Sequence, residues 1–547
     1  MAEPTELERL GRFAATVERS AMPASVRRAA RWQLVDMVAA AHAAARTESV
    51  LAVRAALDAL GGGTGRATVV ASGARRPPVE AAFENAASSM AHDFDDIVWM
   101  GHTCHSAVFA ALAVAEHEGR SSAELVDAIV VANELAGRVG ASSFLGPLNG
   151  QMWTFVHLVG AAAAAARLLG LDAARTTHAL AIALAQPNFA LQPGFLRPSS
   201  KLLSAATPLA TGVRAAYLAR AGMTGAPEIL EDRRGFWRRF AYVAMPLALG
   251  DLGSFWVLDT FTFKTYPVCH YFQTALEALE RLRVRAGDEL PLARVRRVHI
   301  ATTKLACEAS RFAAEYARGP AGVTPVGVCF DLAQAAAVLL RVGRLGVDQL
   351  DEGALARGAE EQRAWVARIE VEHDLGLTAR VIEGARAVGA GRAALGALGP
   401  RELVMLVRRY REEYGSELVS AADAARALGS LVRATSRRLR GLVGAERRGA
   451  EAGSRQDRAA GVGAGGIALY FPARVTVELE DGARLVERID LPSGSVAAPG
   501  AERALERKLL DAAGPALGRA RAARAFGLLC DAEAHDLPAL VGAVVPA

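Results

Sequence analysis

Six consecutive alanines, at positions 161–166, end an apolar run from Phe155 to Ala166, and the segment from Phe155 to Leu169 is predicted to be a helix. Alanine has the highest helix propensity, and its small side chain lets a neighbouring helix approach closely. Apolar residues at helical spacing predict further helices at residues 26–45, 79–91, 107–117, 121–139, 173–184 and 205–221. Small residues dominate the faces of these segments. We therefore expect the first 250 residues to form a buried helical bundle.

The pattern changes around Thr260. Residues 295–302, 365–372, 473–480 and 483–491 alternate with period two and are rich in β-branched side chains, which predicts strands. Glu480, Asp481 and Gly482 join the last two as a hairpin. Helices are expected near 271–282 and 330–340, and again from Ala501 onward. The predicted fold class is mainly α, with a large helical domain and a smaller α+β domain.

A chain of 547 residues is too long for one core, so more than one domain is expected. We place the first part of the helical domain at residues 1–262 and the α+β domain at 263–495. The tail, residues 496–547, should return to the helical domain. An Arg/Gly/Ala-rich insertion around residues 378–466, with helices at 400–414 and 420–442, is expected to be flexible and dispensable for folding.

Composition argues against several classes of protein. The net charge of +5 is small against 63 basic and 58 acidic residues, and 6% aromatic residues offer few stacking platforms, so nucleic acid is not an expected partner. The N-terminus is acidic and amphipathic, unlike a secretory signal, and no apolar run suggests a membrane span. Five scattered cysteines are typical of reduced thiols. We expect a cytoplasmic protein that binds a small molecule.

Three aspartates and three histidines fall within the fourteen residues 92–105: His92, Asp93, Asp95, Asp96, His102 and His105. They lie in a loop before a helix whose first turn offers free N–H groups and a positive dipole end to an anion, which suits a carboxylate substrate. An aspartate beside a histidine is also the minimum pair for moving a proton.

Two other readings of this stretch stay open. A solvated aspartate loop with a capping role needs no chemistry. The sequence HTCH at residues 102–105 has ligand-type side chains, but no CxxC or HExxH motif supplies further ligands at recognisable spacing. We therefore expect no metal.

Several segments together resemble the MmgE/PrpD family of cofactor-independent 2-methylcitrate dehydratases, cis-aconitate decarboxylases and iminodisuccinate epimerases. They are DFDD (93–96), AVAEHEGRSSAELVDAI (113–129), GAAAAAARLLGLD (160–172), GMTGAPEILED (222–232), FKTYPVCH (263–270) and ARVTVELEDGARL (473–485). The resemblance implies a helical domain with an α+β domain across the active site, no cofactor, and a homodimer.

The resemblance also implies site residues. The catalytic aspartate of the family corresponds to Asp93, its histidine to His102 or His105, and its two lysines to Lys201 and Lys264. Two lysines would supply the charge pairing that a di- or tricarboxylate demands. A lysine is more often a surface charge, and Lys264 could also snorkel from an apolar wall. The expected substrate contacts are Asp96, Gln151, His157, Ser204, His270 and Gln334.

This chain departs from the family pattern at several polar positions. Ile97 replaces a threonine, Gln151 and Ser204 replace histidines, Gln334 replaces a tyrosine, and His157 stands at a usual glycine. Gln cannot shuttle protons as His or Tyr can. The cavity should therefore be less ionisable and favour a less charged substrate, so we expect negligible turnover of 2-methylcitrate and cis-aconitate.

These observations predict a cofactor-independent lyase or isomerase that removes a proton next to a carboxylate or carbonyl. Asp93 would act with the histidine, while Lys201 and Lys264 hold anionic oxygens. Dehydration is the default reaction of the family; epimerisation, decarboxylation and cyclisation of a specialised metabolite remain open. The alternative from another class is a non-catalytic binding or scaffold relative.

Overall fold

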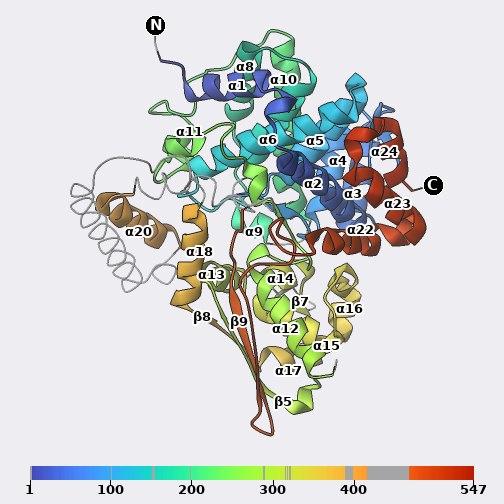
Figure 1. Ribbon diagram of the computed structural model, residues 1–547, viewed down its shortest axis with the longest axis vertical. Helices are drawn as coiled ribbons and strands as arrows, with labels where there is room; N and C mark the ends of the chain where they lie inside the picture. Colours follow the sequence, from blue (N-terminus) through green and yellow to red (C-terminus); the bar gives the residue numbers. More distant parts are fainter. Residues whose placement is uncertain are drawn as a thin grey trace, which may run out of the picture.

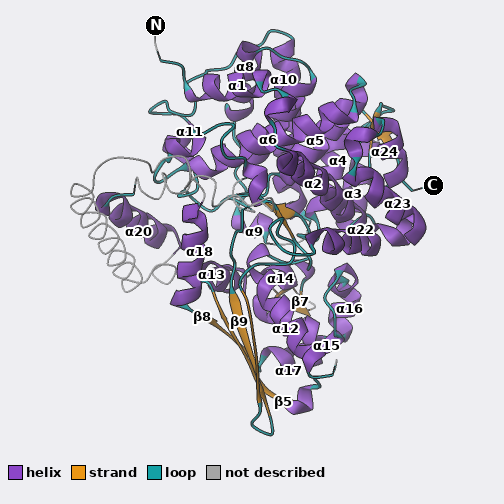
Figure 2. Ribbon diagram, in the orientation of Figure 1, coloured by secondary structure: helices purple, strands orange, loops and turns teal. Residues whose placement is uncertain are grey.

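A computed structural model describes residues 3–99, 101–150, 154–196, 199–287, 290–314, 316, 318–319, 322–387, 398–414 and 467–546. The described chain is mainly helical, with a small mixed four-stranded sheet in its C-terminal region (Figures 1 and 2). The predicted fold class is thus confirmed. Among the described residues, no helix is long and apolar enough to cross a membrane.

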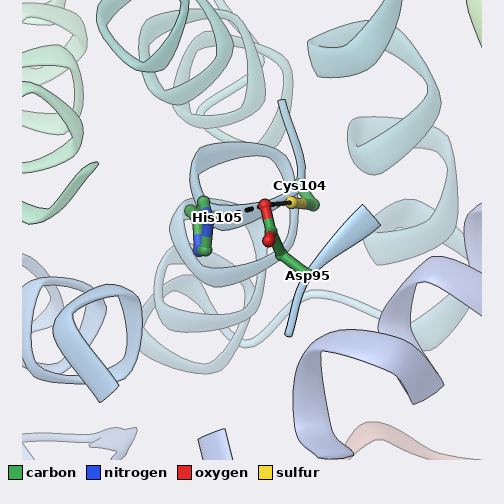
Figure 3. Close-up of side chains that lie close together, drawn as sticks. All are labelled: Asp95, Cys104 and His105. Carbon is green, nitrogen blue, oxygen red and sulfur yellow. Dashed lines mark hydrogen bonds and ion pairs between the residues drawn. The ribbon is translucent and has the colours of Figure 1, made fainter. Parts of the chain in front are cut away.

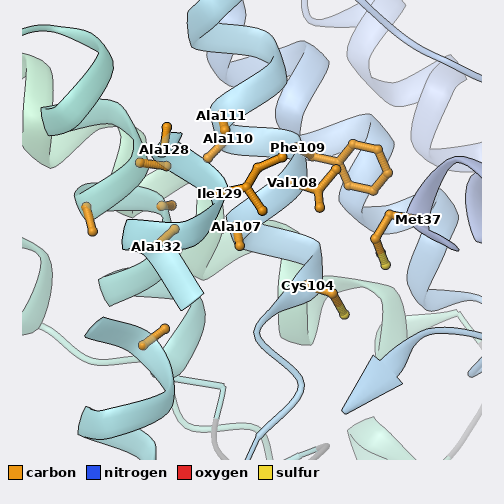
Figure 4. Close-up of a cluster of buried hydrophobic side chains, with 14 of the residues drawn as sticks. Met37, Cys104, Ala107, Val108, Phe109, Ala110, Ala111, Ala128, Ile129 and Ala132 are labelled. Atoms are coloured by element: carbon orange, nitrogen blue, oxygen red, sulfur yellow. The ribbon is translucent and has the colours of Figure 1, made fainter. Parts of the chain in front are cut away.

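The N-terminal helices pack around α7 (Val156–Leu168), which contains the alanine run. Its neighbours are α5 (Cys104–Glu118), α6 (Ser122–Ser142), α8 (Ala173–Leu184) and α10 (Leu203–Arg220). All six alanines are fully buried, as predicted. Figure 4 shows buried side chains where α5 meets α6 and α2, with alanines beside larger residues such as Phe109 and Ile129. The small side chains around α7 let its neighbouring helices approach closely.

Local signals account for the ends of several elements in this region. Ser121 and Glu124 form a capping box, and α6 begins at Ser122, close to the start of the predicted helix at 121–139. α5 begins at Cys104, earlier than the expected Ala107. The other helices here are α1 (Glu6–Thr16), α2 (Ala24–Ala43), α3 (Glu48–Ala59), α4 (Pro78–Met90), α9 (Gln192–Phe195) and α11 (Phe236–Phe240). The short strands β1 (Ala67–Thr68) and β2 (Arg75–Arg76) pair with each other.

The sheet has the strand order β10-β9-β5-β8. β5 (Val295–Thr302) pairs in parallel with β8 (Ile369–His373) and antiparallel with β9 (Ala473–Leu479), which forms the predicted hairpin with β10 (Arg484–Ile489). α12 (Gln273–Arg285) packs on β9 and β10, and α15 (Leu332–Val342) packs on β8. The remaining elements of this region are α13 (Lys304–Ala314), β6 (Arg318–Gly319), β7 (Gly322–Val323), α14 (Pro325–Phe330), α16 (Glu352–Arg357) and α17 (Ala359–Val366).

The predicted strand at residues 365–372 needs a correction. Trp365 belongs to the last turn of α17, and the strand begins only at Ile369. Gln362 and Trp365 are both buried, which is the i, i+3 spacing of a helix face packed on the core. Tertiary burial of this face therefore extends the helix into a segment whose alternation alone favours a strand.

The C-terminal segment forms α22 (Ala501–Leu517), α23 (Arg519–Cys530) and α24 (Leu537–Val544). α22 and α23 pack against α2, near the other end of the chain, as the red and blue helices of Figure 1 show. Such contacts are what a tail that returns to the helical bundle would make. The domain limits at residues 262, 263, 495 and 496 remain proposals.

The described parts of the predicted insertion are packed helices. α20 (Pro400–Tyr414) coincides with the predicted helix at 400–414, and Tyr410 Oη donates to the carbonyl of Gly146 over 3.0 Å. The predicted start at residue 378 falls inside α18 (Leu375–Ala387), in which Leu377 is buried. Excision of the whole insertion would therefore remove core contacts, which corrects the expectation that it is dispensable. The predicted helix at 420–442 and the Gly-rich run lie outside the described residues.

Candidate active site

Two short strands bring distant parts of the chain together at the Asp-rich loop. β3 (Asp96–Ile97) pairs antiparallel with β4 (Thr262–Phe263), with Asp96 opposite Phe263. The backbone N–H of Lys264 then donates to the carbonyl of Asp95 over 3.2 Å. This pairing places Lys264 against the loop that contains Asp93. Ile97, the first departure from the family pattern, is a buried residue of this strand pair.

Lys264 is fully buried and surrounded by acceptors. Its Nζ lies 2.6 Å from Asp93 Oδ2, 2.6 Å from Asp95 Oδ1 and 2.9 Å from the Asp93 carbonyl. Burial alone would lower the pKa of Lys264, but the two carboxylates outweigh it and raise this pKa above its ordinary value. These three acceptors match the three N–H donors of an ammonium group. Lys264 therefore holds the loop together.

Lys201 approaches Asp93 from the turn before α10. Its Nζ donates to the carbonyl of Met90 over 2.7 Å and lies 3.1 Å from Asp93 Oδ1. The rings of Phe195 and Phe330 lie 5.7 Å from the same nitrogen. Burial would raise the pKa of Asp93, but Lys264 and Lys201 more than offset this and hold it below its ordinary value. Asp93 is thus an ionised counter-charge shared by two lysines, in a backbone conformation with φ +52°.

His102 is held by one ring nitrogen. Its Nδ1 lies 2.8 Å from Asp95 Oδ2 and 2.7 Å from the carbonyl of Asp96. Both partners are acceptors, so Nδ1 carries the proton and Nε2 is the basic nitrogen. Burial would raise the pKa of Asp95, but Lys264 and His102 keep it well below its ordinary value. An ionised Asp95 therefore orients the ring and stabilises the imidazolium form.

His105 makes contacts through both ring nitrogens. Nδ1 lies 2.7 Å from Ser89 Oγ, and Nε2 lies 3.2 Å from Asp95 Oδ2 (Figure 3). The side chain is fully buried, and burial lowers its pKa. The described contacts of His102 therefore involve Nδ1 alone, whereas those of His105 involve both ring nitrogens. His105 contacts the carboxylate of Asp95 from the first turn of α5.

The carboxylate that faces the histidines differs from the expected one. Asp93 was expected to pair with His102 or His105, but among the described contacts Asp95 takes this place and Asp93 binds the lysines. Asp95 was missing from the residues expected to form the site. The DFDD motif contained the signal, but sequence spacing alone cannot say which carboxylate of a loop faces a given ring.

Two of the expected substrate contacts are buried histidines near this cluster. His157 Nδ1 lies 3.3 Å from Ser106 Oγ, and its ring packs edge-on against His105 at 5.5 Å. His270 packs edge-on against Phe471 at 4.7 Å, and neither of its nitrogens has a hydrogen-bond partner among the described residues. Burial lowers the pKa of both rings well below the ordinary value, helped by His105 in one case and Lys264 in the other.

The other expected contacts make different interactions. The side chain of Asp96 points towards Gln33 rather than the lysines. Ser204 Oγ donates to the carbonyl of Lys201 over 2.6 Å, and Gln334 Oε1 accepts from Gln362 of α17 over 3.2 Å. Gln151 lies outside the described residues. Among the described contacts, none joins Ser204 or Gln334 to the Asp93–His102 cluster.

One group of side chains in this site has ligand-type atoms close together. Atoms of Asp95, Cys104 and His105 lie within 4.8 Å of one another (Figure 3). Burial, followed by the negative charge of Asp96, raises the pKa of the Cys104 thiol well above its ordinary value, so this thiol is protonated in the metal-free protein. The ammonium of Lys264, 2.6 Å from Asp95, opposes a divalent cation. These residues are a poor fit for a metal ion.

Comparison with known proteins identifies the family. Residues 8–243 match the model of the MmgE/PrpD N-terminal domain. Residues 8–243 of this chain therefore belong to the MmgE/PrpD family. The resemblance predicted from the motifs is thus confirmed. Asp93, His102, His105 and Lys201 lie inside the matched region, whereas Lys264 lies beyond it.

This chain is similar in sequence to several cis-aconitate decarboxylases. The protein from Homo sapiens is 30% identical over 241 residues, which is 41% of this chain and 49% of the relative. The protein from Aspergillus terreus is 28% identical over 302 residues, which is 51% of this chain and 61% of the relative. The matches therefore span about half to three fifths of the length of these relatives.

Proposed function

We propose that this MmgE/PrpD-family protein is a cofactor-independent lyase or isomerase that transfers a proton next to a carboxylate or carbonyl group. The observation that supports this most directly is the arrangement of His102. Asp95 and the Asp96 carbonyl hold Nδ1, which leaves Nε2 as a general base or acid beside the buried lysine–aspartate cluster. This is the geometry of an oriented imidazole, with Asp95 as the orienting group.

In the proposed reaction, Nε2 of His102 removes a proton from the carbon next to the carboxylate, or returns one to it. Asp95 balances the charge of the imidazolium. The substrate carboxylate takes up negative charge as the carbon is deprotonated, so a nearby positive group lowers the barrier. The described contacts of Lys201 occupy two of its three N–H donors, which leaves one for a substrate oxygen.

The start of α5 offers a second group for an anion. No side chain among the described residues caps this helix, so no cap occupies the N–H groups of its first turn. The positive end of the helix dipole faces the loop.

Lys264 has a different role from the one expected. Because its donors are taken by Asp93 and Asp95, we assign it to holding the loop rather than the substrate.

The named relatives make decarboxylation a specific candidate reaction. Loss of CO₂ from a carbon next to a double bond leaves an allylic carbanion, which must receive a proton on carbon. An imidazolium at His102 could supply that proton, so the same arrangement serves decarboxylation, dehydration and epimerisation. We keep the proposal that the departures at Ile97, Gln151, Ser204 and Gln334 favour a substrate other than cis-aconitate or 2-methylcitrate. The homodimer and cytoplasmic location also remain proposals.

The experiment follows the proton directly. Purified protein is incubated in D₂O with cis-aconitate, 2-methylcitrate and a panel of unsaturated and hydroxylated di- and tricarboxylates, while NMR records deuterium incorporation and CO₂ release is measured. We expect turnover or exchange with at least one acid of the panel, and negligible turnover of the first two. His102→Gln should lower the rate by about 10²–10⁴-fold. His299→Gln, a partly exposed histidine of β5, is the matched control and should keep it.

The outcomes separate the two parts of the proposal. Turnover of cis-aconitate or 2-methylcitrate at about 1 per second or faster would show that the four departures do not redirect the substrate. Absence of turnover and of exchange with every acid would argue for a non-catalytic relative. Equal rates in wild type and His102→Gln would remove His102 from the reaction.

A further inference from the structure

A third buried lysine lies behind the Asp93–Asp96 loop. Lys508 of α22 has a side chain that is 2% exposed, and its Nζ lies 2.5 Å from Asp36 Oδ1 of α2. The same nitrogen donates to the carbonyl of Phe94 over 2.6 Å and lies 3.8 Å from the centre of the Phe94 ring. Lys508 and Phe94 are 414 residues apart in sequence. The C-terminal helix α22 therefore contacts the backbone of the site loop directly.

Phe94 stands between the two aspartates of the site. Lys264 donates to the carboxylate and to the carbonyl of Asp93, and Lys508 donates to the next carbonyl, that of Phe94. Two successive peptide groups are thus held by two lysines that come from different parts of the chain. Asp93 has φ +52°, a conformation that non-glycine residues keep only where the surroundings hold it in place.

A network of neutral side chains holds the other end of the loop. Gln33 Nε2 donates to Asp96 Oδ1 over 3.1 Å, and Asn133 Nδ2 donates to Gln33 Oε1 over 2.7 Å. Thr103 Oγ1 donates to Asn133 Oδ1 over 2.5 Å. The residues on either side of the His102 ring, at Asp96 and Thr103, are therefore tied to α2 and α6. None of these described bonds involves the carbonyl of Phe94, to which Lys508 donates.

We propose that Lys508 is a positioning residue of the active site: by holding the Phe94 carbonyl, it sets the direction of Asp95 and hence of the His102 ring. Nothing in the family match extends to this residue, since the matched model ends at residue 243. The kinetic part of the test rests on the proposed proton-transfer function, whereas the spectroscopic part does not.

The energetics agree with a role beyond stability. A fully buried ion pair costs much of its attraction in desolvation, and replacing such a pair with apolar residues is often neutral or stabilising. Burial raises the pKa of Asp36 to about 6 even beside Lys508, and burial lowers the pKa of Lys508. The bond from Lys508 to the Phe94 carbonyl is the contact that an apolar pair could not replace.

The test uses the single variant Lys508→Met and the double variant Asp36→Leu/Lys508→Met. The double variant removes both charges together, so no unpaired charge stays buried and the protein should fold. Lys304→Met is the control, because Lys304 is a partly exposed lysine on α13. The readouts are kcat and KM on an acid that the wild type turns over, and the ¹⁵N imidazole shifts of His102, assigned with His102→Gln.

We expect the folded double variant to lose about 10²-fold in kcat with little change in KM, since a displacement of about 1 Å at a catalytic group can cost that much. The ¹⁵N shifts of His102 should move towards a mixture of tautomers as its hydrogen bond to Asp95 loosens. Lys304→Met should match the wild type in both readouts.

Each other outcome is decisive. A folded double variant with wild-type kcat and unmoved His102 signals would overturn the proposal, and so would a double variant that fails to fold, because Lys508 would then serve folding. If the wild type is inactive on every acid, the proposed function fails separately. The His102 signals then decide alone: a shift in the variant supports the positioning role and an unchanged spectrum refutes it.

Discussion

At the scale of single residues, His157 offers a test of burial that does not depend on catalysis. Its folded-state pKa lies well below 6.5 because the ring is buried beside His105. The unfolded chain therefore takes up a proton at His157 as the pH falls through about 6.5, while the folded chain does not. Protonation of His157 in the unfolded chain therefore lowers the free energy of unfolding, with a slope that approaches about 1.4 kcal/mol per pH unit well below pH 6.5.

His157→Gln removes this linkage. The stability of the variant relative to wild type should rise by about 1 kcal/mol between pH 6.5 and 5.5, and should be constant above about pH 7.5. Urea unfolding at several pH values measures the difference. His299→Gln is the control for the substitution itself, because solvent reaches that ring. A pH-independent difference for His157→Gln would mean that His157 is protonated in the folded protein.

The ligand-type atoms of Asp95, Cys104 and His105 give a second test at this scale. The ammonium of Lys264, which lies beside Asp95, disfavours a divalent cation there, so we expect no stoichiometric zinc or iron in the purified protein. Activity should survive EDTA. Elemental analysis that finds one tightly bound metal per chain, lost together with activity in Cys104→Ser, would contradict this expectation.

At the scale of elements, the close packing of α7 and α10 is set by a glycine. A Cβ at Gly212 of α10 would lie 2.4 Å from the carbonyl oxygen of Leu158 in α7. Backbone at such a distance must shift, so Gly212→Ala should destabilise the protein by about 1–3 kcal/mol. Gly527 of α23 has nothing within 4 Å of the same position and is exposed. Gly527→Ala should therefore stabilise the protein by about 0.5–1 kcal/mol.

Thermal and urea unfolding of the two Gly→Ala variants measures the change in stability at each position. The sign of the change is the informative result, since helix propensity alone favours alanine at both positions. A Gly212→Ala variant as stable as Gly527→Ala would mean that α7 and α10 separate at little cost.

At the scale of the whole molecule, the composition of the Arg/Gly/Ala-rich segment 415–466 predicts that it can be replaced at little cost. Replacing residues 415–466 with a flexible Gly/Ser linker should change the unfolding free energy by less than about 1 kcal/mol, because the entropy of loop closure depends only weakly on length. Excision of residues 375–468 is the comparison and should lower the unfolding free energy by more than this replacement does. It removes the buried Leu377 and Leu406, each typically worth about 2–5 kcal/mol when truncated.

The solubility and the unfolding midpoint of both deletion variants measure this difference in stability. Loss of soluble protein in the shorter replacement would show that residues 415–466 contribute to the core or to an interface.

Much of the local structure followed from the sequence itself. The alanine run predicted the buried helix α7, the apolar spacing of residues 121–139 predicted α6, and the alternation around Gly482 predicted the hairpin of β9 and β10. Each of these signals acts between residues a few positions apart. The motifs also placed Asp93, His102, Lys201 and Lys264 in one family pattern, which the comparisons confirmed at the level of the family.

The partners within the site were decided only by tertiary structure. Lys264 meets Asp95 across 169 residues, and Lys508 meets Phe94 across 414. The pairing of β3 with β4 and the packing of α22 on α2 create these contacts, and both depend on how whole elements bury their apolar faces. Spacing along the chain could predict an acidic loop beside a histidine. It could not predict that Asp95 orients His102 while Asp93 binds two lysines, because the direction of each carboxylate is set by groups that fold in from elsewhere.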